Sequence, residues 1–246
     1  MADLFGNTVS SDEYGAQQIE VLEGLDPVRR RPGMYIGGTD DRAMHHLVAE
    51  ILDNSMDEAV AGHAGWIEIN LLDEKHVLIS DNGRGIPVDP HPKFPNKSAV
   101  EVILTTLHAG GKFSGKSYET SGGLHGVGAS VVNALSISLD VEVARDRKLY
   151  KQSFSKGKPT SSLVIAGSAP NRRGTSIKFS PDPEIFGNGC KFEPATLYKM
   201  AKSKAYLFAG VEIRWKCSQT LLTNNITSTP QSETICYPGG LADYLT

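Results

Sequence analysis

The chain has 246 residues, a formal net charge of -3, 39% hydrophobic residues and 22% charged residues, which is the balance of an ordinary globular protein. No apolar run approaches the roughly 18 residues that a membrane span needs, and the net charge gives no overall attraction to nucleic acid. The start lacks the basic and apolar blocks of a secretion signal, so residues 1–15 are expected to form a flexible arm and residues 16–246 one domain. The cysteines Cys190, Cys217 and Cys236 lack metal-ligand spacing, which predicts free thiols and a cytoplasmic protein.

The first half of the chain predicts a long helix and then a hairpin. Apolar residues recur at helical spacing over 39–62, with Thr39 or Asp40 as the cap. Two β-rich runs, 66–72 and 76–81, follow and are joined by a short polar turn. The second run therefore ends in an acidic residue at a strand terminus.

The rest of the chain predicts further helices and strands. A capping box of Ser98 and Glu101 begins a helix that is expected to run through Leu107 to the next glycines. Further expected elements are a short helix over 127–135, strands over 138–144, 149–154, 175–179 and 211–215, a helix over 195–208 and a surface loop over 222–232. This order predicts an α+β fold, a two-layer sandwich of a mixed, mostly antiparallel sheet with helices on one face.

Glu50 and Asn54 are one helical turn apart on the predicted long helix. A carboxylate there can polarise a water, and an amide oxygen beside it can ligate Mg²⁺ near phosphate groups. The same stripe carries Asp57 and Glu58, so it is expected to border a cleft. The alternative is a solvated acidic helix face, since charged stripes usually mean no more.

Asp81 ends a predicted strand and is followed by Gly83, Gly85 and Pro87. The glycines open the backbone and the proline fixes a turn, so that a flat base can approach. A carboxylate at this position can accept the exocyclic amine of adenine. The alternative is a simple Asp-Asn-Gly turn after a hairpin strand.

A glycine-rich segment over 122–128 precedes a predicted helix, and successive backbone N–H groups there can converge on phosphate oxygens. The alternative is a flexible linker or helix-packing glycines. Residues 110–117 also match the P-loop pattern GxxxxGK[ST]. A P-loop requires a strand before it and a helix after it, however, and this segment follows a predicted helix and precedes a non-helical stretch.

Other catalytic patterns are not met. His45 and His46 precede Glu50 but do not form the HExxH zinc motif, so both are predicted to be surface or packing residues. No GxSxG elbow presents a serine nucleophile. The three segments around Glu50, Asp81 and residues 122–128 together suit ATP as the ligand.

These segments, with 24–37 and 107–113, resemble the ATPase domain of bacterial type IIA topoisomerase B subunits, which has the GHKL or Bergerat ATP-binding fold. The resemblance covers nearly the whole chain from Tyr14 onward. Segments 29–31, 52–58 and 236–245 look more like the B subunit of topoisomerase IV than that of gyrase.

The resemblance implies roles residue by residue. Glu50 is expected to be the general base for water attack on the γ-phosphate, Asn54 the Mg²⁺ ligand, and Asp81 the adenine anchor beside Thr175. The other expected ATP-site residues are Glu58 and its partner Arg84, then Gly85, Ile86, Pro87, Ile103, Lys112, Tyr118, Leu124, His125, Gly126, Val127 and Gly128, and Tyr14 from the partner protomer's arm.

The resemblance also implies partners: the A subunit of topoisomerase IV in a heterotetramer, DNA, and a second copy of this chain on ATP binding, with no membrane. A following domain with a lysine for the γ-phosphate is expected beyond residue 246, so the chain alone should bind ATP but hydrolyse it slowly. Chaperones, mismatch-repair ATPases and histidine kinases share the three motifs and remain alternatives. Another alternative is a nucleotide sensor in which Glu50 has no catalytic duty.

Overall fold

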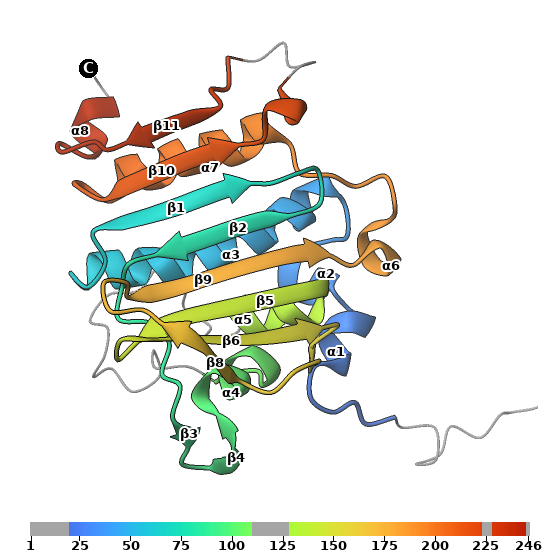
Figure 1. Ribbon diagram of the computed structural model, residues 1–246. Helices are drawn as coiled ribbons and strands as arrows, with labels where there is room; N and C mark the ends of the chain where they lie inside the picture. The colour runs from blue at the N-terminus through green and yellow to red at the C-terminus, as the bar shows by residue number, and fades with distance from the viewer. Residues whose placement is uncertain (1–19, 110–127, 223–227, 245–246) are drawn as a thin grey trace, which may run out of the picture.

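The computed structural model describes residues 20–109, 128–222 and 228–244, and one nine-stranded sheet runs through them (Figure 1). The strand order is β11-β10-β1-β2-β9-β5-β6-β7, with β8 also paired to β6. Only the β1–β10 pair is parallel among the pairs that the described residues form. The strands are β1 (Trp66–Leu71), β2 (Val77–Asp81), β5 (Ser136–Arg145), β6 (Lys148–Ser155), β7 (Lys158–Pro159), β8 (Val164–Ser168), β9 (Gly174–Pro181), β10 (Glu212–Cys217) and β11 (Ser232–Ile235).

Helices cover one face of this sheet, as Figure 1 shows, so the predicted two-layer α+β fold is confirmed. The covering helices are α3 (Asp41–Val60), α4 (Ala99–Thr105), α5 (Gly128–Ala134) and α7 (Pro194–Leu207). Short elements complete the chain: α1 (Asp26–Arg30), α2 (Gly33–Ile36), α6 (Pro183–Phe186), η3 (Gln219–Leu221), α8 (Leu241–Tyr244) and a hairpin of β3 (Pro90–His91) and β4 (Phe94–Ser98). No helix of the described residues has the length and apolar character needed to cross a membrane.

The core forms between the sheet and helix α3. Alternate residues of β1 and β2 are buried, among them Ile69 and Ile79, and they pack with Leu47 and Ile51 of α3. Each such fully buried side chain stabilises the fold by about 1.5–3 kcal/mol. The alternation in β2 continues to its last residue, so Asp81 lies on the helix-covered face with the core.

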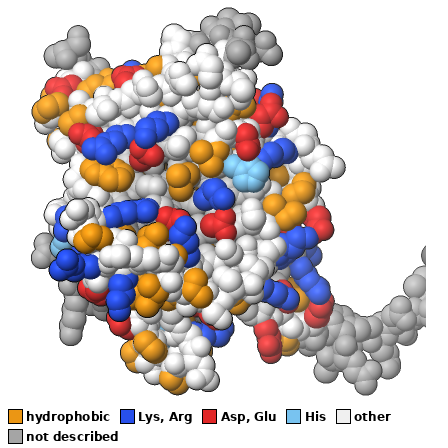
Figure 2. All heavy atoms as spheres, in the orientation of Figure 1, with side chains coloured by type: hydrophobic (Ala, Val, Ile, Leu, Met, Phe, Trp, Pro, Cys, Tyr) orange, Lys and Arg blue, Asp and Glu red, His pale blue; other side chains and the backbone are white. Residues whose placement is uncertain are grey.

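No helix of the described residues covers the opposite face of the sheet in Figure 1, and Figure 2 shows that this face carries mixed charge. Its cations pair with acids across the strands: Lys216 with Glu68 at 2.7 Å and Lys178 with Asp140 at 3.1 Å. Opposite charges on neighbouring strands favour the pairing in water. This face is therefore a solvated one.

Most predicted elements are present with shifted ends. Asp40 is the cap of α3, since its side chain accepts from the N–H of Ala43. The prediction that the helix after Ser98 reaches Leu107 was wrong, because α4 ends at Thr105 and Thr106 is extended. The Thr105 hydroxyl donates to the Glu101 carbonyl, a bond that competes with continuation of the helix. The three cysteines are free thiols, as expected.

Candidate functional site

Asp81 is the centre of the candidate site, and this residue is only 8% exposed. Its Oδ1 accepts hydrogen bonds from the backbone N–H groups of Gly83 at 2.9 Å and Thr175 at 3.3 Å. Its Oδ2 accepts one from the hydroxyl of Ser55 on α3 at 3.1 Å. Burial raises the pKa of Asp81, and these three hydrogen bonds oppose that rise. The carboxylate is thus fixed in orientation, with acceptor capacity left for a donor on a ligand.

Glycines allow this close packing around Asp81. Gly174 has a φ of +115°, and a Cβ there would lie 2.0 Å from the Asp81 carbonyl oxygen. At Gly83 a Cβ would lie 2.7 Å from Oε2 of Glu58. Only glycine fits at position 174, because the atom that a Cβ would meet there belongs to the backbone. At position 83 a Cβ would displace the Glu58 carboxylate.

The turn after Asp81 is held by side chains from other elements. Glu58 on α3 accepts from the Arg84 backbone N–H at 2.9 Å and pairs with its guanidinium at 2.7 Å, so the expected Glu58–Arg84 pair is present. The hydroxyl of Thr175 accepts from the N–H of Ile86 at 3.2 Å. Arg145 donates to the Gly85 carbonyl at 2.9 Å. Sheet and helix together therefore fix the backbone that a flat ligand would meet.

Glu50 lies near the beginning of α5. A Cβ on Gly128 would lie 2.2 Å from Oε2 of Glu50, so the first residue of α5 sits directly against this carboxylate. His46, one turn earlier on α3, places Nε2 3.1 Å from Oε1 of Glu50. That hydrogen bond raises the pKa of His46. The two histidines differ, because His45 is buried and accepts from the N–H of Glu193, which is a packing role.

Helix α5 is held by contacts at its C-terminal end. Asn133 is fully buried and donates to the Leu104 carbonyl at 2.8 Å, which ties α5 to α4. Arg29 of α1 donates to the Ala134 carbonyl at 2.7 Å and pairs with Asp182, which is fully buried. The position of Gly128 beside Glu50 is therefore set by contacts away from the site.

Asn54 is half-buried on α3, one turn after Glu50, and on the same stripe as Glu58. Asp57, predicted to share that stripe, is instead only 2% exposed and belongs to the interior. Among the residues that the structure describes, no group of three His, Cys, Asp or Glu side chains could hold a metal ion. A single amide oxygen still suits Mg²⁺, which takes few protein ligands and keeps waters and phosphate oxygens.

Part of the predicted site lies outside the described residues. These are Tyr14, Lys112, Tyr118, Leu124, His125, Gly126 and Val127, together with the P-loop match over 110–117. Of the remaining predicted residues, Pro87 is exposed near the turn and Ile103 is half-buried on α4. Sequence reasoning missed Ser55, Gly174, Arg145 and His46. Only His46 had a local signal, its spacing of four residues from Glu50.

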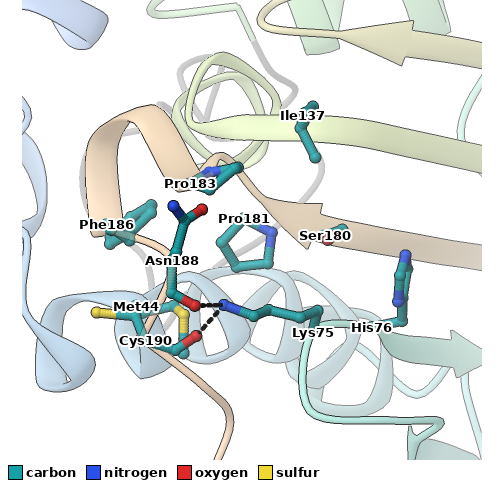
Figure 3. Close-up of a pocket in the computed structure, with 11 residues that line it drawn as sticks. Met44, Lys75, His76, Ile137, Ser180, Pro181, Pro183, Phe186, Asn188 and Cys190 are labelled. Atoms are coloured by element: carbon teal, nitrogen blue, oxygen red, sulfur yellow. Dashed lines mark hydrogen bonds between the residues drawn. The ribbon is translucent and has the colours of Figure 1, made fainter.

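A separate cavity of about 320 Å³ lies at the other end of the strands (Figure 3). None of the predicted ATP-site residues lines it. Lys75 points across it and donates to the carbonyl oxygens of Asn188, at 2.9 Å, and Cys190. Lys75 thus ties the chain after α6 to the β1–β2 turn, which is a structural use of the cation.

The profile of the family described as "Histidine kinase-, DNA gyrase B-, and HSP90-like ATPase" matches residues 39–185, more than half of the chain. The chain belongs to this family. The matched residues include Glu50, Asn54, Asp81 and Thr175. The GHKL fold that the resemblance implied is the fold of this family and of this chain.

Sequence identities to individual relatives show which members of the family the chain resembles more. The chain is 61% identical over 234 residues to the B subunit of DNA topoisomerase 4 from Caulobacter vibrioides, covering 95% of this chain and 33% of the relative. It is 55% identical to the protein of the same name from Rickettsia bellii, covering 100% of this chain and 37% of the relative. Against the B subunit of DNA gyrase from Thermotoga maritima the identity is 47%, covering 95% and 35%. The expected greater likeness to topoisomerase IV agrees with these values.

A solved structure of the same fold supports the assignment. The 43K ATPase domain of Thermus thermophilus gyrase B, in complex with an aminocoumarin, superimposes with a TM-score of 0.75 at 42% identity, covering 89% of this chain and 53% of that one. The chain spans about a third of the length of the curated relatives it matches.

Proposed function

We propose that this chain is the ATP-binding and ATP-hydrolysing part of the B subunit of a topoisomerase IV, in which ATP drives a protein clamp for DNA strand passage. The observation that carries the proposal is the buried, oriented carboxylate of Asp81 at the end of β2. Its Oδ2 receives one hydrogen bond from protein, which leaves acceptor capacity for the exocyclic amine of adenine.

The remaining described residues fit a base and its phosphates. Gly85, Ile86 and Pro87 would lie along the base, with Arg84 held beside it by Glu58. Ile103 would close the apolar side. The N–H groups of residues 124–128, with Lys112 and Tyr118, would hold the phosphates and ribose, and Tyr14 of a second copy would complete the site.

Hydrolysis would depend on Glu50. Its carboxylate is beside Gly128, where the phosphate-binding segment enters α5, and it can take a proton from the attacking water. Asn54 would hold Mg²⁺, which would neutralise charge on the phosphates. His46, hydrogen-bonded to Glu50, would restrict the rotation of the carboxylate.

The wider assignment follows from the relatives. Their names, which describe B subunits of topoisomerase 4, support a partner subunit and DNA in the full enzyme. Beyond that, we propose that the partner is an A subunit, that the enzyme is cytoplasmic, and that two copies of this domain pair when ATP binds. We expect these 246 residues, tested alone, to bind ATP and to hydrolyse it slowly.

Calorimetry with a non-hydrolysable ATP analogue, with and without Mg²⁺, tests the proposal. We expect wild-type binding that is lost in Asp81→Asn and kept in Lys116→Ala. Binding that survives Asp81→Asn but is abolished by Lys116→Ala would place the nucleotide on the P-loop match instead.

The catalytic part of the proposal needs a second experiment. In the full-length protein, Glu50→Gln should abolish turnover while binding of the analogue is retained. Unchanged turnover would indicate a nucleotide sensor in which Glu50 has no catalytic duty.

A further inference from the structure

Arg173 lies just before Gly174, outside the set of residues that would touch a nucleotide. Its Nε donates to the carbonyl oxygen of Asn82 at 3.0 Å, and its Nη2 donates to that of His63 at 2.9 Å. One planar group thus joins the residue after Asp81 to the loop between α3 and β1. The fork of a guanidinium is suited to two such acceptors at once.

The Asn82 side chain makes a second connection to the same loop. Its Oδ1 accepts from the N–H groups of Gly65 at 2.8 Å and Trp66 at 3.0 Å. Asn82 is therefore held on both sides, by its side chain to the start of β1 and by its carbonyl to Arg173. The peptide between Asn82 and Gly83 therefore has little freedom to rotate.

That peptide determines the geometry of the adenine site. The Gly83 N–H that donates to Asp81 follows directly after the Asn82 carbonyl, so the two groups belong to one peptide plane. Gly174, next to Arg173, packs against the Asp81 carbonyl, and Thr175 donates to the Asp81 carboxylate. Rotation of this plane would move a donor away from Asp81.

Arg172, the residue before Arg173, binds different partners and so serves as a comparison. It is the neighbouring arginine, yet its guanidinium binds Glu142 at 3.2 Å and the Ser176 hydroxyl at 3.0 Å. Neither partner lies in the turn after Asp81. The two adjacent arginines therefore serve different parts of the fold.

We propose that Arg173 is a positioning residue of the adenine site, which holds the peptide between Asn82 and Gly83 by binding the carbonyl oxygens of Asn82 and His63. This inference rests on the proposed binding of ATP at Asp81. Arg173 does not touch the nucleotide; it acts through the backbone that carries the Gly83 donor.

The test compares Arg173→Ala, Arg173→Lys, Arg172→Ala, Asp81→Asn and the wild type by calorimetry with a non-hydrolysable ATP analogue. Arg173→Ala is expected to bind about fivefold more weakly, because it loses the hydrogen bonds that the exposed Arg173 guanidinium donates to two carbonyl oxygens. Arg173→Lys should be intermediate, since one ammonium cannot replace the fork. Arg172→Ala should bind as the wild type does. The gain in affinity from Mg²⁺ should be the same in all variants that bind, because Mg²⁺ would act at the phosphates.

A second measurement separates positioning from general loss of stability. Amide hydrogen exchange at Gly83 should become faster in Arg173→Ala and Arg173→Lys, while exchange at Ile79 in the middle of β2 stays unchanged. Faster exchange at both residues would indicate a merely structural role and overturn the inference. Wild-type affinity in both Arg173 variants, or equal weakening in Arg172→Ala, would also overturn it.

These variants distinguish the proposed ATP site at Asp81 from the proposed role of Arg173. Analogue binding that is unaffected by Asp81→Asn contradicts the proposed ATP site itself. Binding that is lost in Asp81→Asn but unchanged in both Arg173 variants contradicts only the role of Arg173.

Discussion

The backbone N–H of Thr175 donates a hydrogen bond to Oδ1 of Asp81 at 3.3 Å, although the two residues are 94 positions apart in the sequence. The bond is possible because β2 and β9 are antiparallel neighbours, so the end of one meets the beginning of the other. Gly174 lets the two backbones approach closely at this point.

Gly174→Ala should therefore disrupt both the fold and the site. A Cβ 2.0 Å from the Asp81 carbonyl oxygen, at a φ of +115°, forces the strands apart. We expect a loss of about 3 kcal/mol or more in the free energy of unfolding, measured with urea, and loss of ATP-analogue binding. Gly167→Ala is the control, since a Cβ there meets open space. It should change the free energy of unfolding and the binding of the analogue little. Equal stability of the two variants would contradict the proposed backbone contact.

Asp81→Asn should stabilise the fold at neutral pH while it removes function. Burial raises the pKa of Asp81, so between its unfolded and folded pKa values the folded state holds a proton that the unfolded state lacks. Stability from this group is then lost as pH rises through the folded pKa. Asparagine keeps the acceptor without the charge, and we expect the free energy of unfolding at pH 7 to rise by on the order of 1 kcal/mol.

Asp73→Asn is the control, because its expected change in the free energy of unfolding at pH 7 has the opposite sign. Desolvation acts to raise the pKa of Asp73, but hydrogen bonds from Lys75 and His76 outweigh it, so its pKa is lowered. The charged form of Asp73 stabilises the fold above the unfolded pKa, and the variant should be slightly less stable at pH 7. Urea titrations at pH 7 and at acidic pH measure both variants. A fall in stability for Asp81→Asn at pH 7 would show that its accepted hydrogen bonds outweigh its buried charge.

Ser55→Ala should weaken binding of the ATP analogue by about three- to tenfold, since the loss of one hydrogen bond to a buried carboxylate lets the group rotate. Because that hydrogen bond lowers the pKa of Asp81, its removal should also move the acidic fall in affinity to higher pH. Calorimetry across pH detects both effects. Ser203→Ala, whose hydroxyl donates to the Lys199 carbonyl on α7, should bind as the wild type does. The idea fails if the two serine variants behave alike.

The pKa of His46 should lie above that of a free histidine, because its hydrogen bond to Glu50 favours the charged ring. The pair then contributes stability below the unfolded pKa, and the contribution is lost as pH rises through the folded pKa. NMR of the ring protons measures the midpoint, and Glu50→Gln should lower it. A midpoint for His46 that does not respond to Glu50→Gln would show that the pair does not form in solution.

The sequence determined much of the fold because its signals are local. Helical spacing before Gly62 placed α3, and the position of Asp81 at the end of an alternating run placed the carboxylate at a strand terminus. Glu50 and Asn54 share a helix, so their mutual geometry followed from helical periodicity alone. The predicted end of helix α4 was wrong, because the Thr105 hydroxyl binds the Glu101 carbonyl and competes with continuation of the helix.

Other features depended on the tertiary structure, since they join segments that periodicity cannot relate. Ser55 and Asp81 are 26 residues apart, and Arg173 and His63 are 110 residues apart. The burial of Asp57, the clearance at Gly174 and the contact of Gly128 with Glu50 depend on how the helices pack on the sheet. The sequence by itself determined which residue types could meet a nucleotide. Only packing decided which backbone groups hold those residues in place, because such contacts depend on distances between elements that no local pattern encodes.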